Sequence, residues 1–302
     1  MKVCIGITTK NRGEILQKAI HSALEQSYAN KEVLVFDDGS SDITRDLPEK
    51  YPQVRWIRED ESIGLLEARN KMMKTCGADL FVSLDDDAWF LKGDEIELAV
   101  AYMESNSEIG AISFDVLQND TRRFNPVERA EPIECNMFIG CGHMLRLKSV
   151  REIDYYIPFP LKYGHEEKDL CIRLIDAGYI IIFLPGVHVW HDYTSVERNI
   201  REQRFSFFVN DLIFPFRRVP LRYVFFVLLN SIYRKLHSTQ FESDVKREAI
   251  FKFFQIIPSQ MKYVKRVKAK SYLRYRAKSK QFLAYMKAND QNLSSETEGR
   301  EL

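Results

Sequence analysis

The chain has 302 residues, of which 45% are hydrophobic and 29% are charged, and its formal net charge is +1. This composition excludes a wholly disordered or fibrous protein and fits one large globular domain with a smaller annex. No stretch of about eighteen apolar residues is free of charge, and the first apolar run is too short for a signal peptide. Five cysteines without any C-x-x-C spacing indicate reduced thiols and a cytoplasmic location.

Strands and helices alternate through the first half of the chain. The predicted strands cover residues 2–8, 32–36, 54–57, 79–84 and 110–116, and the predicted helices cover 15–24, 65–75 and 94–105. Short connections between alternating elements imply parallel strands joined by right-handed crossovers. We therefore expect an α/β fold, Rossmann-like, with a mostly parallel sheet and helices on both faces.

Ligands in such sheets bind where the loops at the carboxyl ends of the strands converge. The first of these loops, TTKNRG, contains neither a dinucleotide-binding fingerprint nor a phosphate-binding P-loop. Residues 117–134 are polar and irregular, which is typical of a functional or mobile loop. We expect the loops over 119–134 and 136–143 to select the second substrate.

Three aspartates directly follow the strand predicted at 79–84. In extended backbone Asp85 and Asp87 point to the same side and can share one cation, whereas Asp86 points away. Adjacent carboxylates at a strand end favour Mg²⁺ or Mn²⁺ bound through oxygen. The alternative is a solvated acidic turn that caps the helix near Gly93.

An earlier acidic turn, FDDGSSD, contains Asp37 and Asp38. A carboxylate at this strand end can accept hydrogen bonds from a nucleobase or a ribose. The alternative is a purely structural turn in which Gly39 permits the backbone path and the following polar residues cap a helix.

A third acidic group begins the helix predicted in GHEEKDLCIRLIDAGY. Glu166, Glu167 and Asp169 fall in its first turn, where acids complement the positive end of the helix dipole. A general base for an attacking hydroxyl group is the functional alternative. In the strand that follows, alternation places His188 and His191 on opposite faces, and a lone histidine is more often structural than a ligand.

Taken in order, these features resemble the family 2 glycosyltransferases, which are inverting, nucleotide-sugar-dependent enzymes with the GT-A fold. The resemblance spans roughly residues 2–195 and is carried by the motifs VCIGITTKNR, EVLVFDDGSSD, GLLEARN, LDDDA, GHEEKDLCIRL and VHVWHD. Two departures are Glu167, where an aspartate is usual, and Lys10, where an aromatic residue is common.

The resemblance implies a role for each matching position. It assigns the nucleotide to Thr8, Asp37, Asp38, Arg69 and Asp86, the metal (Mn²⁺ or Mg²⁺) to Asp85, Asp87 and His191, and base catalysis to Glu167, with Glu166 and Asp169 as rivals. The implied reaction is a single in-line displacement with inversion at the anomeric carbon.

The alternation of strands stops beyond residue 198. The apolar stretch that follows is interrupted by charges at Asp211, Arg217, Arg218 and Arg222, so we expect helices that pack on the catalytic domain or lie on a membrane surface. Basic residues interleaved with tyrosines over 262–280 favour an anionic membrane surface, and we expect no nucleic-acid partner. The predicted domains are 1–200 (GT-A), 201–288 (helical, basic and aromatic) and 289–302 (disordered tail).

The expected function is metal-dependent, inverting transfer of a sugar from a nucleotide-sugar donor to a hydroxyl of a glycan or lipid-linked acceptor. We expect surface polysaccharide synthesis in the cytoplasm, at the inner face of the cell membrane. The alternatives are a non-catalytic, membrane-associated assembly partner and a sugar-phosphate nucleotidyltransferase.

Overall fold

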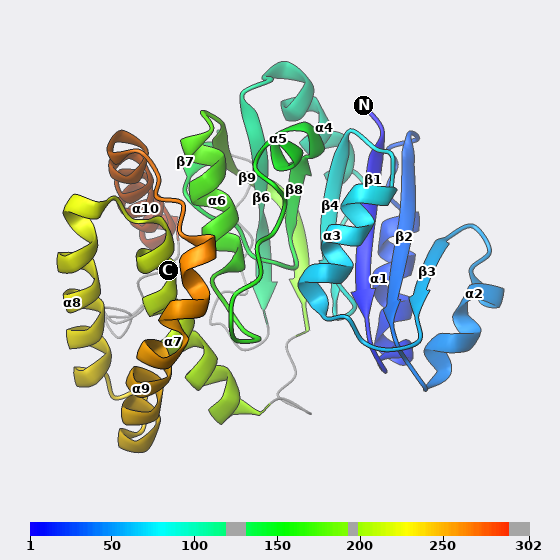
Figure 1. The fold of residues 1–302 in the computed structure, drawn as a ribbon. Helices are drawn as coiled ribbons and strands as arrows, with labels where there is room; N and C mark the ends of the chain where they lie inside the picture. The colour runs from blue at the N-terminus through cyan, green and yellow to red at the C-terminus, as the bar shows by residue number, and fades with distance from the viewer. Residues whose placement is uncertain (119–130, 193–198, 290–302) are drawn as a thin grey trace.

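The computed structural model describes residues 1–118, 131–192 and 199–289 (Figure 1). Its described strands form one sheet in the order β3-β2-β1-β4-β8-β6-β9-β5, with β7 paired to β9. The strands are β1 (Val3–Thr9), β2 (Lys31–Asp38), β3 (Arg55–Glu59), β4 (Leu80–Asp85), β5 (Ala88–Phe90), β6 (Ile109–Gln118), β7 (Ile133–Cys135), β8 (His143–Arg146) and β9 (Ile180–His191).

Helices cover both faces of this sheet, because each carries an apolar stripe that needs a partner surface. Helices α1 (Gly13–Leu24) and α4 (Glu95–Ser105) share one apolar core with the sheet, and α3 (Leu65–Thr75), α5 (Leu147–Glu152) and α6 (Glu166–Asp176) share the other. A short helix, α2 (Leu47–Lys50), lies between β2 and β3. The predicted α/β fold with helices on both faces is confirmed.

The sheet is parallel where the sequence predicts crossovers and mixed elsewhere. Strands β1 to β4 are parallel, whereas β8 runs antiparallel to both β4 and β6, and β5 runs antiparallel to β9. The predicted irregular segment over 117–134 is shorter than expected, because β6 reaches Gln118 and β7 occupies Ile133–Cys135. The rest of that predicted loop, 119–130, lies outside the described residues.

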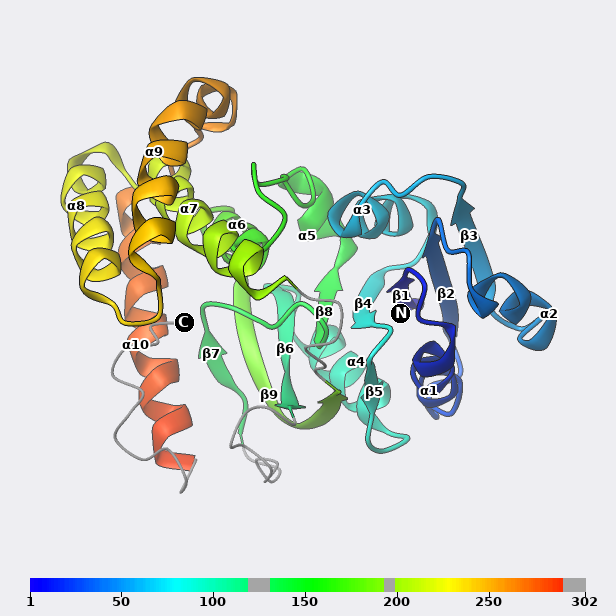
Figure 2. The same cartoon turned by 90° about the horizontal axis from the view of Figure 1, so that it is seen from below.

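Four long helices follow β9 and gather at one end of the sheet, opposite β3 (Figure 1, Figure 2). They are α7 (Ile200–Arg218), α8 (Leu221–His237), α9 (Ser243–Gln260) and α10 (Ala269–Asn289). Within the described residues, none of the helices is long and apolar enough to cross a membrane. The tail predicted to be disordered falls almost entirely outside the described part.

Two arginines attach these helices to the catalytic part of the chain. Arg218 is fully buried and its Nε lies 2.5 Å from Asp169 of α6. Arg217 is also fully buried, and its guanidinium lies 4.7 Å from the ring centre of Phe159 and 4.6 Å from that of Tyr263. Both charges lie inside the protein, which fits the expectation that these helices pack on the catalytic domain.

Candidate active site

The carboxyl ends of β1, β2 and β4 bring the predicted nucleotide and metal residues to one edge of the sheet. Thr8 of β1 is in register with Phe36 of β2 and with Asp85 of β4. Asp37 and Asp38 are the last residues of β2. Because these strands are parallel, their ends meet at the edge where open α/β sheets bind ligands.

Asp37 and Asp38 both stabilise the turn that follows β2. Asp37 accepts a hydrogen bond from the Ser40 N–H at 2.8 Å and pairs with Arg58 at 2.5 Å. Both oxygens of Asp38 accept hydrogen bonds from residues 62–64, which lead into α3. The structural role expected as the alternative is therefore observed, and a nucleotide contact would use the acceptor positions that these bonds leave.

Arg69 of α3 lies at the centre of the candidate site and is only 1% exposed. Its Nη2 lies 2.6 Å from Asp85 Oδ1 and donates to the Gly140 carbonyl at 3.1 Å. Burial opposes the charged form, but the negative charges of Asp85 and Glu167 raise the pKa of Arg69 above its ordinary value. Arg69 is thus a fixed cation between the acids that end β4 and those that begin α6.

Glu166 and Glu167 occupy the first turn of α6, as the sequence predicts. A Cβ atom added to Gly140 would lie 2.5 Å from Glu167 Oε1, so this carboxylate fills the space above the loop that precedes β8. Burial, and next the charge of Glu166, raise the pKa of Glu167 to about 8. A carboxylate with a raised pKa is a better proton acceptor, which suits a general base.

Asp169 is not available as a base, which corrects its place among the predicted rivals of Glu167. It is completely buried, and its oxygens accept hydrogen bonds from Arg173 Nε at 2.7 Å and Arg218 Nε at 2.5 Å. Two guanidinium groups compensate the buried carboxylate. Asp169 therefore joins α6 to the C-terminal helices.

Arg12, in the loop after β1, contacts two of the three aspartates that follow β4. Its Nη1 lies 3.0 Å from Asp86 Oδ1 and its Nη2 lies 2.9 Å from Asp87 Oδ2. Asp86 also accepts a hydrogen bond from the Thr9 hydroxyl at 2.9 Å, and burial raises the pKa of Asp86 to about 7. Arg12 was not among the predicted site residues, because its only signal in the sequence is a basic residue after the first strand.

His191 is the last residue of β9 and faces the acidic turn. Its Nε2 lies 3.2 Å from Asp87 Oδ1. Burial opposes protonation, but hydrogen bonds to Asp87 and Cys141 raise the pKa of His191 to about 11. His188 lies instead 3.8 Å from Asp115, so the two histidines face different surroundings, as strand alternation predicts.

Three side chains of the site can hold a metal ion together. The donor atoms of Asp85, Cys141 and His191 lie within 4.8 Å of one another. Their oxygen, sulfur and nitrogen atoms fit a divalent transition metal, provided that the imidazole gives up its proton. Asp87, the other predicted ligand, contacts His191 from outside this group. Cys141 was not predicted, because no local pattern shows that the segment before β8 lies beside β4 and β9.

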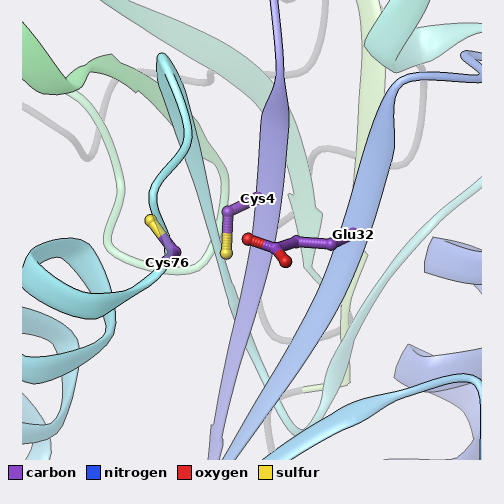
Figure 3. A group of neighbouring side chains, drawn as sticks. All are labelled: Cys4, Glu32 and Cys76. Atoms are coloured by element: carbon purple, nitrogen blue, oxygen red, sulfur yellow. The ribbon is translucent and has the colours of Figure 1, made fainter.

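A second group of donor atoms, from Cys4, Glu32 and Cys76, lies at the opposite edge of the sheet (Figure 3). Cys4 and Cys76 are buried in an apolar core, and the Cys76 thiol donates to the Met73 carbonyl at 3.8 Å. Glu32 is 3.3 Å from Lys2 Nζ. This group lies at the strand starts, away from Asp85, and its thiols pack as small apolar side chains.

The family model for glycosyl transferase family 2 matches residues 4–157, about half of the chain. This chain belongs to glycosyltransferase family 2. The family and the fold agree with those expected from the sequence.

The curated relatives carry names from polysaccharide biosynthesis. The chain is 26% identical over 194 residues to WfgD of Escherichia coli, a UDP-Glc:α-D-GlcNAc-diphosphoundecaprenol β-1,3-glucosyltransferase; the alignment covers 59% of this chain and 74% of WfgD. It is 30% identical over 102 residues to TuaG of Bacillus subtilis, named for teichuronic acid biosynthesis; the alignment covers 32% of this chain and 40% of TuaG. The chain thus spans less than two thirds of TuaG and only 18% of the next relative, an uncharacterised glycosyltransferase of Rickettsia felis.

Solved structures support the fold along almost the whole chain. Staphylococcus aureus TarS, residues 1–349, in complex with UDP-GlcNAc, gives a TM-score of 0.63 at 18% identity, covering 96% of this chain and 88% of that one. The mannosyltransferase PcManGT from Pyrobaculum calidifontis, in complex with GDP-Man and Mn²⁺, gives 0.58 at 17% identity, covering 95% and 83%. At these identities the likeness establishes the fold alone.

Proposed function

We propose that this glycosyltransferase is metal-dependent and inverting, and that it moves a sugar from a nucleotide-sugar to a hydroxyl group of a glycan or lipid-linked acceptor. The observation that carries the proposal is the meeting of buried Arg69 with the half-buried Asp85 and Glu167 at the carboxyl edge of the sheet. This displacement needs a cation that stabilises the leaving diphosphate and a base of raised pKa.

We assign the donor to the edge formed by β1, β2 and β4, with Thr8, Asp37, Asp38 and Asp86 around the nucleoside. Arg69 is directed to the diphosphate, because a buried guanidinium gives fixed, charge-assisted hydrogen bonds to phosphate oxygens. Structures of TarS with UDP-GlcNAc and PcManGT with GDP-Man support a nucleotide-sugar as the donor class.

We assign a Mn²⁺ or Mg²⁺ ion to Asp85 and His191, with Asp87 holding the imidazole and Cys141 close enough to bind. When bound, such an ion offsets the negative charge on the departing diphosphate. Structural neighbours that contain Mn²⁺ support the choice of cation.

We assign base catalysis to Glu167, with Glu166 beside it. In the proposed step Glu167 accepts the proton of the acceptor hydroxyl while that oxygen forms the new bond to the anomeric carbon. The carbon–oxygen bond to the diphosphate breaks on the opposite side, which inverts the configuration. Base catalysis typically contributes on the order of a hundredfold to ten-thousandfold.

We place the acceptor in polysaccharide synthesis and the chain at the inner face of the cell membrane. The name of WfgD, which contains a diphosphoundecaprenol acceptor, supports a lipid-linked substrate. Tyr272 and Tyr275 of the basic stretch are buried in the core, so a membrane contact would use other side chains. One series of exposed apolar side chains lies on α8, at Leu221, Phe225, Leu229 and Tyr233, one helical turn apart. Phe251 and Phe254 of α9 and Leu273 of α10 are exposed as well.

The proposal is tested by the release of nucleoside diphosphate from a panel of nucleotide-sugars, in the presence of detergent-solubilised bacterial lipid acceptors. Wild-type protein should release one nucleoside diphosphate with Mn²⁺, and Glu167→Gln should reduce the rate at least roughly a hundredfold. The same variant should bind the donor normally, because the base does not hold the nucleotide. Full activity in Glu167→Gln would refute the assignment of the base.

A further inference from the structure

A cavity of about 580 Å³ lies among the C-terminal helices, outside the candidate active site. Its walls come from α7, α8 and α10, and Lys168 of α6 reaches it from the catalytic part. None of the residues proposed to bind the donor or the metal ion lines it. The proposed donor and metal sites therefore do not account for this cavity.

The charges that line this cavity are strongly unbalanced. Five cationic side chains line it: Lys168, Arg234, Arg276, Lys280 and Lys287. The described lining contains one carboxylate, Asp211, which is already 2.9 Å from Lys235 Nζ and 2.7 Å from His165 Nε2. Within the described ranges, no acidic side chain forms an ion pair with Lys168, Arg276, Lys280 or Lys287. Cations that converge without acidic partners favour an anionic ligand.

The spacing along α10 shows why these groups converge. Tyr272, Arg276 and Lys280 are four residues apart, so they lie on one helix face, and Lys287 continues that face two turns later. Tyr272 and Tyr275 are buried against Tyr223 of α8 and Phe214 of α7, while Arg276 and Lys280 remain exposed to the cavity. The basic and aromatic pattern thus has two uses, packing for the tyrosines and a positive wall for the cations.

An apolar surface adjoins the positive wall. Phe226 of α8 lines the cavity and is 71% exposed, which places it at the opening. It follows Phe225 in the exposed series that also contains Leu221 and Leu229. A ligand seated here would meet cations at one end and aliphatic and aromatic side chains at the other. That combination fits an amphipathic anion better than a free ion or a polynucleotide.

We propose that this cavity binds the phosphate group of a lipid, whose apolar chain lies along the exposed side chains of α8. Arg276 supplies a planar group that can donate two hydrogen bonds to one phosphate, and Lys280 and Lys168 supply compact charges. The lipid can be a membrane phospholipid or the carrier of a lipid-linked acceptor, since both present a phosphate on an apolar chain. This inference deepens the proposed function at its acceptor side.

The test is isothermal titration of the full chain with three soluble probes: dihexanoyl phosphatidic acid, farnesyl diphosphate and inorganic phosphate. At least one lipid probe should bind saturably and at least roughly tenfold more tightly than inorganic phosphate. Tighter binding of farnesyl diphosphate would identify the isoprenoid carrier as the source, and tighter binding of phosphatidic acid would identify the phospholipid. Equal affinity for inorganic phosphate, or no saturable binding of either lipid probe, would overturn the proposal.

A matched pair of variants separates this site from general attraction between charges. Arg276→Gln with Lys280→Gln should weaken lipid binding at least roughly tenfold. Arg247→Gln with Lys270→Gln removes the same charges from exposed positions outside the cavity and should change the affinity less than about twofold. Equal losses in the two double variants would overturn the proposal. Binding of the nucleotide-sugar, measured in parallel, reports folding and the donor site, so a failed donor site is distinguishable from a failed lipid site.

Discussion

Gly140 leaves the space that the carboxylate of Glu167 occupies, since a Cβ atom at residue 140 would lie 2.5 Å from Oε1 of Glu167. Gly140→Ala should therefore displace the proposed base while leaving the fold intact, because the clashing atom is the mobile end of a long side chain. We expect kcat to fall about tenfold to a hundredfold. Steady-state kinetics should show a KM for the donor within roughly twofold of wild type. An unchanged kcat would mean that Glu167 works from another position.

The pH dependence of transfer should report the raised pKa of Glu167. A general base acts in its deprotonated form, so kcat/KM should rise with pH below about 8 and level off above it. Glu167→Gln should remove this limb from the pH profile. A limb that persists in the variant would assign the titration to another group.

The raised pKa of Glu167 should also make the free energy of unfolding depend on pH, in the opposite direction to the activity. Between about 4.5 and 8 the folded chain keeps a proton on Glu167 that the unfolded chain has lost, so raising the pH through this range destabilises the fold. Glu167→Gln removes this penalty, and its urea midpoint relative to wild type should increase with pH. A difference that does not depend on pH would contradict the shifted pKa.

Asp169→Asn should destabilise the protein strongly without acting on catalysis directly. The carboxylate is fully buried between Arg173 and Arg218, and its loss leaves two buried guanidinium groups without compensation. Breaking a buried ion pair from one side typically costs roughly 3–5 kcal/mol. Urea unfolding at neutral pH measures this cost, with Glu167→Gln as the neighbouring control. A stable but inactive Asp169→Asn variant would return Asp169 to the candidates for the base.

Cys141 should be detectable as a metal ligand by spectroscopy. Its sulfur belongs to the same group of donor atoms as Asp85 and His191. Titration with Co²⁺ should produce a thiolate-to-metal charge-transfer band in the near ultraviolet, because cysteine is a soft, polarisable ligand. Cys141→Ser should lose the band and Cys171→Ser, a change at another buried cysteine, should keep it. A band of full strength in Cys141→Ser would exclude the thiolate from the metal site.

Hydrophobic periodicity was enough to predict the fold class and most of the parallel strands. The helix expected over 65–75 is observed as Leu65–Thr75, because its apolar stripe is strong and its neighbours are short loops. The antiparallel strands β5 and β8 were not predicted, since their partners lie far away in the sequence. Local pattern contains no information on such pairing.

Some residues of the candidate site were likewise predicted from the sequence, and others were not. Asp85, Asp38 and Glu167 stand directly at the ends of predicted elements, where position alone indicates a ligand-binding edge. Arg12 and Cys141 reach the site only through tertiary contacts with Asp87 and His191. Charged residues were the least predictable group, because whether a charge is exposed depends on partners that the linear sequence does not reveal.

The most direct test of the account is the thermal stability of the protein with UDP-, GDP-, dTDP- and CDP-sugars, each with and without Mn²⁺. The proposed donor site predicts that one nucleotide class raises the Tm of the wild-type protein only when Mn²⁺ is present. Asp85→Asn, which removes the carboxylate shared by the metal group and Arg69, should abolish that increase. No increase in Tm with any of the nucleotide-sugars would contradict the account and leave a transferase fold without a working donor site.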